Sequence, residues 1–214
     1  MFRRVRARIG LRGVMRVAAA LGVAMVAAPL VTACSSSASP AAASAQAATG
    51  NGTCTTTITG QTVRNVFVPA GHTCTLENVI VHGNITDYGT LNLTTSAAIG
   101  GSVVAKPGSQ LIESGPTSVT VDGNLTINGT TSAQLSLDHI RGNFTVEHVM
   151  KFSWTDSVIG KNIFWLNNGG GNQVIGGNTV GGNINCSGNA AVPTNGGNPN
   201  TVHGHETGQC AGLH

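Results

Sequence analysis

The sequence predicts an all-β protein, a right-handed parallel β-helix (solenoid) of about six coils with disulfide-capped ends. Three observations predict it: a motif repeated between residues 81 and 184, apolar residues at every second position, and two cysteine pairs that bracket the repeats. Charged residues make up only 9% of the chain and glycine contributes 30 residues, which favours tight turns over amphipathic helices. A β-sandwich with glycine-rich turns is the alternative, but its strands rarely keep one motif in register six times.

The repeated motif is an aliphatic residue, any residue, Gly, Asn and an apolar residue. Successive copies begin 18 to 22 residues apart, a period typical of a stacked solenoid. The six copies are VHGNI, IGGSV, VDGNL, IRGNF, IGKNI and VGGNI, beginning at Val81, Ile99, Val121, Ile140, Ile159 and Val180.

Apolar residues two positions apart follow each motif, as in Leu125 and Ile127 or Phe144 and Val146. This period of two places them on one face of short strands. A single coil cannot bury that face alone, but stacked coils share a continuous core. Parallel crossovers are strongly right-handed, and the same handedness is predicted here.

The Gly-Asn step marks a corner of each coil. Glycine permits a sharp bend, and asparagine bonds nearby backbone groups. Stacking should align the asparagines in one column, a structural ladder in which each side chain bonds the next. The second coil has Ser102 in this column and the fifth has Lys161 in place of glycine; the asparagines are Asn84, Asn124, Asn143, Asn162 and Asn183.

Residues 1–33 have the features of a lipoprotein signal peptide: six arginines, then an apolar stretch, then small residues. Val31 to Cys34 resembles a bacterial lipobox, in which Cys34 carries a diacylglycerol and acyl chains such as palmitate. An ordinary signal peptide is the alternative. Residues 34–50 form a lipidated cysteine and a flexible Ser/Ala tether, because they contain no large apolar side chain.

The folded domain should therefore span residues 51–214. The whole chain has a formal charge of +3, but six of its eleven basic residues lie in the signal. The remaining five face eight acidic residues, so the exported part has a charge of −3. It shows no basic patch and no aromatic stacking platform, and we expect no nucleic-acid partner.

Four cysteines remain after Cys34, and an even number in an exported domain indicates disulfides. Three connectivities are possible. We favour Cys54–Cys74 and Cys186–Cys210, because each pair brackets one end of the repeats. A metal or redox site is the alternative, but no CxxC spacing occurs. His203, His205, Glu206 and His214 lie near Cys210 and suggest metal binding, although a polar surface is favoured and no metal or other cofactor is predicted.

No catalytic residue is assigned from the sequence, and an enzyme is disfavoured. The fourth coil holds the densest group of ionisable residues, and a general acid–base pair is conceivable there. A solvated polar face is the simpler interpretation. The group comprises Asp138, His139, Arg141, Glu147, His148, Lys151 and Asp156. Asp122 and Arg141 hold the same motif position one coil apart and should form a surface ion pair.

Aromatic residues gather in the fourth and fifth coils as Phe152, Trp154, Phe164 and Trp165. They suggest an exposed strip that binds a glycan or a partner. Alternation nevertheless places Trp165 inward and Phe164 outward, so core packing should account for at least half of them.

The segments NVFVPAGHTCTLENVIVHGNI (residues 65–85) and NTVGGNINCSGN…PNTVHGHETGQCAGL (residues 178–213), with the repeats between them, resemble exported actinobacterial parallel β-helix repeat lipoproteins of unassigned activity. The resemblance covers nearly all of residues 51–214. It implies the fold and export, and it supplies no catalytic residues. Bactofilins share the Gly-Asn repeats, but the lipobox separates this chain from those cytoplasmic polymers.

The leading hypothesis is a non-catalytic lipoprotein on the extracytoplasmic face of the cell membrane. Its lipid anchor binds the membrane, and its role is structural or an interaction with an envelope glycan or protein. A carbohydrate-active β-helix enzyme, a polysaccharide lyase or hydrolase, is the second hypothesis. A self-assembling surface scaffold is the third, although loops at both ends disfavour it.

Overall fold

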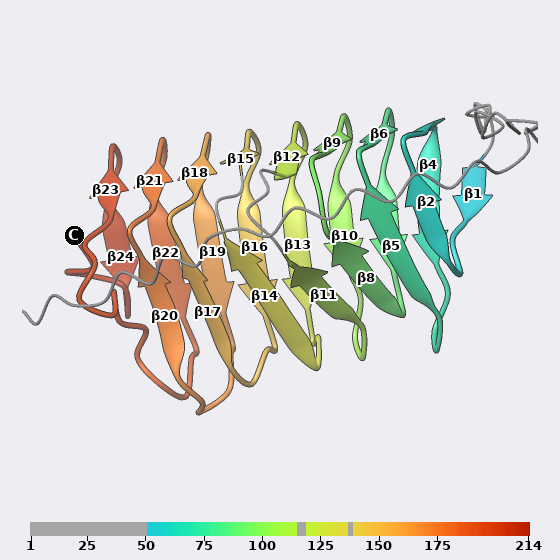
Figure 1. The fold of residues 1–214 in the computed structure, drawn as a ribbon. Helices are drawn as coiled ribbons and strands as arrows, with labels where there is room; N and C mark the ends of the chain where they lie inside the picture. Colours follow the sequence, from blue (N-terminus) through green and yellow to red (C-terminus); the bar gives the residue numbers. More distant parts are fainter. Residues whose placement is uncertain (1–50, 115–118, 137–138) are drawn as a thin grey trace, which may run out of the picture. The chain divides into compact units, whose positions relative to one another are not determined.

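The computed structural model describes residues 51–114, 119–136 and 139–214, which form a parallel β-helix of about eight turns (Figure 1). These residues contain 24 strands and no helix, and therefore no helix able to cross a membrane. The predictions for the signal peptide, Cys34 and the tether lie outside the described residues. The parallel β-helix and its two disulfides are confirmed.

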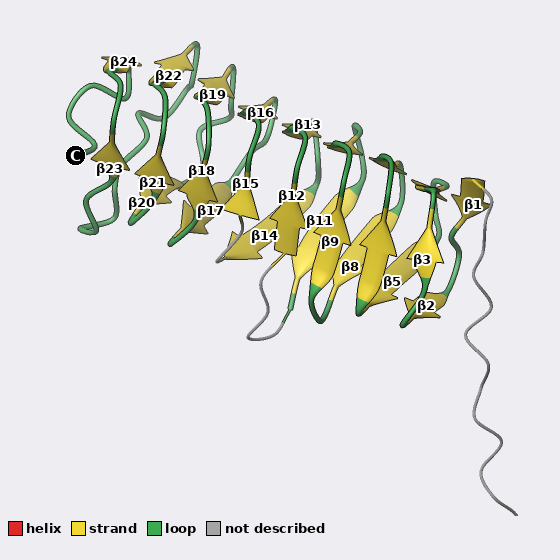
Figure 2. Ribbon diagram, turned by 90° about the horizontal axis from the view of Figure 1, so that it is seen from above, coloured by secondary structure: helices red, strands yellow, loops and turns green. Residues whose placement is uncertain are grey.

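Three parallel sheets, named A, B and C, form the three faces of the β-helix. Figure 2 shows the strands of sheet C in a row between those of sheets A and B. Sheet A contains β1 (Asn51–Thr53), β4 (Asn65–Val68), β7 (Ile85–Asp87), β10 (Val103–Ala105), β13 (Leu125–Asn128), β16 (Phe144–Glu147), β19 (Ile163–Leu166), β22 (Ile184–Ser187) and β24 (Glu206–Gly208).

Sheet B contains β2 (Thr57–Thr59), β5 (Thr73–Glu77), β8 (Thr90–Leu93), β11 (Gln110–Glu113), β14 (Ser132–Ser136), β17 (Phe152–Thr155) and β20 (Gln173–Gly176). Sheet C contains β3 (Thr62–Val63), β6 (Val79–Val81), β9 (Ala97–Ile99), β12 (Val119–Val121), β15 (His139–Ile140), β18 (Val158–Ile159), β21 (Thr179–Val180) and β23 (Thr201–Val202).

Equivalent positions of successive coils lie above one another. In sheet A, Leu125 pairs with Phe144, and Phe144 pairs with Ile163. These side chains are buried, while the intervening Thr126 and Thr145 face outward. The period of two thus fills one continuous core along the stack.

The prediction of about six coils is too low. Further coils precede and follow the six motifs, because β1 and β4 begin sheet A and β24 ends it. The coil before the motifs has Arg64 in place of glycine, and the coil after them has His205 in place of asparagine. A sequence pattern that requires both glycine and asparagine therefore does not match the first and last coils.

Candidate binding face

The ladder asparagines form a column at the corner that leads into sheet A. Each side-chain Oδ1 accepts a hydrogen bond from a backbone N–H of the next coil, as from Asn143 to Asn124 at 2.8 Å. Only one bond joins two of these side chains, from Asn162 Nδ2 to Asn143 Oδ1 at 3.1 Å. The ladder asparagines were expected to bond one another through their side chains. Most of them instead bond the backbone of the next coil.

The column also extends beyond the motifs. Asn65 Oδ1 accepts from the Asn84 amide at 2.7 Å, and Asn183 Oδ1 accepts from the His205 amide at 2.8 Å. Ser102 continues it with its hydroxyl oxygen, which accepts from the Asn124 amide at 3.0 Å. The ladder thus ties the sheet A edge of successive coils together.

The motif glycine is required by close stacking, and not by an unusual backbone angle. The amide of Gly142 bonds the carbonyl oxygen of Gly123 at 2.9 Å. A Cβ at Gly142 would lie well under 3.0 Å from that oxygen. The motif glycines lie at the predicted bends, but they do not have positive φ angles, so the bend does not by itself require glycine. At Lys161 the equivalent bond to Gly142 lengthens to 3.2 Å.

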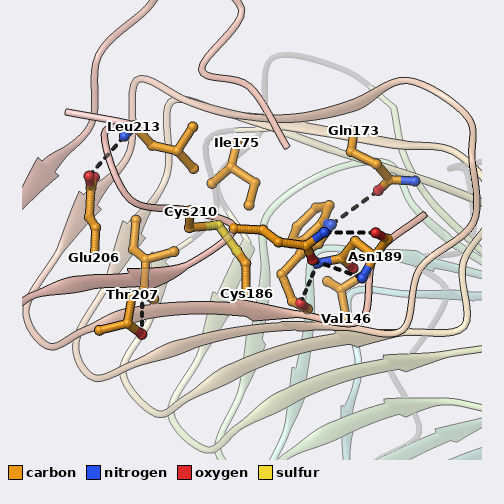
Figure 3. Close-up of a disulfide and its surroundings, with 12 residues drawn as sticks. Val146, Gln173, Ile175, Cys186, Asn189, Glu206, Thr207, Cys210 and Leu213 are labelled. Carbon is orange, nitrogen blue, oxygen red and sulfur yellow. Dashed lines mark hydrogen bonds between the residues drawn. A yellow bond between two sulfur atoms is a disulfide. The ribbon is translucent and has the colours of Figure 1, made fainter. Parts of the chain in front are cut away.

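The disulfides join Cys54 to Cys74 and Cys186 to Cys210, with Cα atoms 5.3 and 5.2 Å apart. All four sulfurs are buried at the two ends of the core. The prediction that one pair staples each end is confirmed. Figure 3 shows the Cys186–Cys210 bridge beside Ile175 and Leu213.

Glu206 secures the last turn of the described chain. Its Oε2 accepts the backbone amide of Leu213 at 2.8 Å (Figure 3). The same oxygen accepts the backbone amide of Gly212 at 3.0 Å and pairs with His214 Nδ1 at 2.8 Å. Leu213 is buried over the core. The residues considered for metal binding instead anchor this turn or, like His203, lie exposed; no group of three metal-ligating side chains forms in the described part of the chain.

The ionisable residues of the fourth coil lie at separate corners. Arg141 pairs with Asp122 at 3.1 Å, as predicted. Glu147 accepts a hydrogen bond from Asn128 at 2.7 Å at the far edge of sheet A. Asp156 follows sheet B and accepts from Asn198 at 3.2 Å. The structure does not gather these three carboxylates at one place, and Asp138 lies outside the described residues.

Core packing, predicted for at least half of the four aromatic residues, accounts for three of them, and they form no exposed strip. Phe152, Trp154 and Trp165 are buried, and the ring centroids of Phe152 and Trp165 are 5.3 Å apart. Phe144 joins them, with its centroid 4.3 Å from that of Trp154. Strand β17 places Phe152 and Trp154 at alternating inward positions, which the sequence leaves ambiguous. Phe164 alone faces outward.

Two further ladders lie inside the other corners. Asn168, Asn189 and Gln209 bond in series, with Asn189 Oδ1 accepting from Asn168 at 3.0 Å. At the corner that follows sheet B, Asn200 Oδ1 accepts hydrogen bonds from Asn178 at 3.1 Å. Their spacings of 20 to 22 residues match the coil length, and this periodicity is the signal that could have revealed them.

The corner that follows the strands of sheet A, where Asn168 lies, also contains incompletely bonded polar groups nearer the N-terminus. Asp87, Ser109 and Thr130 are buried, and each has a side-chain oxygen with no hydrogen-bond partner. Burial raises the pKa of Asp87 to about 6, while the hydrogen bond from the backbone amide of Gly89 acts in the opposite direction. A buried carboxyl with a raised pKa is therefore part of the core.

The outer face of sheet A carries one outward column along nine strands. The column contains no charged residue, and an aromatic ring stands near each end: Thr53, Phe67, Thr86, Val104, Thr126, Thr145, Phe164, Asn185 and Thr207. Phe67 is 43% exposed, and its ring centroid lies 5.8 Å from that of Tyr88, which is also 43% exposed.

Two shallow hollows on this face share a phenylalanine, two ladder asparagines and a threonine among their lining residues. The first, of about 380 Å³, is lined by Phe67, Thr86 and the ladder residues Asn65 and Asn84, among others. The second, of about 270 Å³, is lined by Asn162, Phe164, Asn183, Asn185, His205 and Thr207. In each, one phenylalanine stands beside two consecutive ladder asparagines.

Comparison with protein-family models, with curated proteins and with solved structures found no match to this chain.

Proposed function

We propose that this chain is a non-catalytic, lipid-anchored module of the cell envelope that binds an extracytoplasmic partner. The basic and apolar N-terminal segment and Cys34 support export and anchoring. The disulfide at each end of the core supports an oxidising compartment. Two acyl chains give stable membrane attachment, whereas one gives only marginal binding.

The proposed binding role rests on the outer face of sheet A. It is an uninterrupted ladder of nine parallel strands whose outward column is polar or aromatic except at Val104. The hydrogen-bonded corner and the packed core hold these side chains at fixed positions. A rigid surface of this kind loses little conformational entropy when it binds an extended partner.

Detergent phase separation of the full-length protein tests the anchor. The wild type should enter the detergent-rich phase, and Cys34→Ala should remain in the aqueous phase because it has no acceptor for the diacylglycerol. Cys54→Ala, which leaves the lipobox intact, is the matched cysteine control and should partition like the wild type. Recovery of the wild type in the aqueous phase would contradict the anchor.

Product analysis tests the non-catalytic assignment. The purified protein, incubated with envelope polysaccharide, should retain the polymer without releasing new reducing ends or unsaturated sugars. Release of such products by the wild type, and its loss in Glu147→Gln, would instead support a lyase or hydrolase that uses the fourth coil.

A further inference from the structure

The two hollows of sheet A repeat one arrangement at a fixed separation. Phe67 and Phe164 hold the same column, five strand steps apart, in β4 and β19. At about 4.8 Å per step the two rings stand about 24 Å apart along the helix axis. Between them the column contains only Thr86, Val104, Thr126 and Thr145, so nothing bulky or charged interrupts the path.

The ladder supplies hydrogen-bond donors along the same path. The Oδ1 atoms of Asn84, Asn124 and Asn183 accept backbone amides within the column. Their amide NH₂ groups have no hydrogen-bond partner in the described part of the chain, and all three side chains are exposed. An amide NH₂ carries two donors, so the ladder corner offers donors at three positions, which are two and three coils apart.

We propose that the outer face of sheet A binds a neutral linear glycan along the helix axis, with Phe67 and Phe164 as its two stacking positions. This inference rests on the proposed binding role and names its ligand class. The carbon–hydrogen face of a sugar ring packs on an aromatic ring, and its hydroxyl and ring oxygens accept from the asparagine amides and the threonine hydroxyls.

Charge favours a neutral glycan over an anionic polymer. The outward column has no charged residue, and Glu147 and Lys106 lie toward the far edge of sheet A. At the ladder corner, Arg141 is paired with Asp122, and Arg64 and Lys161 are exposed beside Asn65 and Asn162. The exported part as a whole has a net charge of −3, which repels an anionic polymer. A linear chain fits because the two positions lie on one straight column, several sugar residues apart.

Affinity electrophoresis of the mature full-length lipoprotein tests the site, with linear neutral glucans, mannans, galactans and arabinans as probes. At least one probe should retard the wild type, with little dependence on salt because the contacts are uncharged. Phe67→Ala and Phe164→Ala should each weaken that retardation by about tenfold. Ile80→Ala is the matched control, because Ile80 is an exposed aliphatic residue of sheet C, 48% exposed.

Length dependence separates two stacking positions from one. Short oligosaccharides span one ring, so losing the other ring should not affect them, whereas long chains should be sensitive to both substitutions. Circular dichroism and melting temperature should match the wild type in all three variants, since these side chains lie outside the core.

Three results would overturn the glycan site, and one of them would leave the proposed binding role standing. Wild-type binding to none of the neutral probes, or equal binding by the phenylalanine variants and Ile80→Ala, would overturn the glycan site. Capture of a protein or an anionic polymer insensitive to both phenylalanine substitutions would also overturn it, yet would leave the proposed binding role standing.

Discussion

Replacing Asp87 with Asn should remove a pH-dependent loss of stability from this protein. Asp87 is an inward residue of β7 and is fully buried. Its Oδ1 accepts a hydrogen bond from the Gly89 amide at 2.9 Å, and its Oδ2 has no partner. Burial raises the pKa of the carboxyl from 3.8 to about 6, because the core disfavours the charged form.

The direction and size of the effect follow from this pKa. The folded state binds the proton more tightly than the unfolded chain, so the contribution of Asp87 to stability is fully present below pH 3.8. It is lost as the pH rises and is gone above about pH 6. At 1.36 kcal/mol per pKa unit, ionising the buried carboxyl costs the folded state about 3 kcal/mol.

Urea unfolding of both proteins at several pH values measures this cost. The free energy of unfolding of Asp87→Asn, relative to wild type, should rise by about 2 to 3 kcal/mol between about pH 4 and about pH 7.5. Asp122→Asn is the control, because that side chain is 44% exposed in its ion pair and should show little such change. A constant difference between Asp87→Asn and wild type at all pH values would refute the reasoning.

Four further variants test the stacking, one end disulfide and a turn. Gly142→Ala should lower the free energy of unfolding by about 1–3 kcal/mol, measured in urea, because its Cβ would collide with the coil below. Asn143→Ala should cost about 1–3 kcal/mol in the same assay and speed amide exchange at Asn162, whose N–H loses its acceptor. Joint replacement of Cys54 and Cys74 by Ala should cost about 3 kcal/mol, seen as a lower melting temperature, and reducing agent should then act only through the remaining Cys186–Cys210 disulfide. His148→Gly should raise the melting temperature slightly, because residue 148 has a φ of 57° that glycine adopts without strain.

The sequence was sufficient for the fold because the repeat specifies it locally. Each coil needs a close approach at one corner and apolar residues at every second position, and both requirements leave a period in the sequence. The pairing of Cys54 with Cys74 followed from the same period, since 20 residues equal one coil. The outer coils were missed because Arg64 and His205 perform the corner's backbone bonding without the side chains of the motif.

The binding face was harder to predict because it depends on the register of segments without a motif. Phe152 and Trp154 lie in sheet B, where no Gly-Asn step marks which residues point inward. In sheet A the register is fixed by the motif, and there the alternation did place Phe164 outward and Trp165 inward. It also places Asp87 inward, two residues after Ile85, so the buried carboxyl was available to sequence reasoning and was overlooked.

The C-terminal end of the described helix favours lateral binding over growth of the stack. Glu206 occupies the inward position that Ile184 holds one coil earlier. Its carboxylate is bonded to the amides of Gly212 and Leu213, and Leu213 is buried at the end of the core. Adding another coil there would require displacing this turn and placing an apolar residue against a carboxylate, which costs the bonds and the desolvation of the charge. Sheet A's outer face needs no such rearrangement, which supports the proposed binding there over growth at this end of the stack.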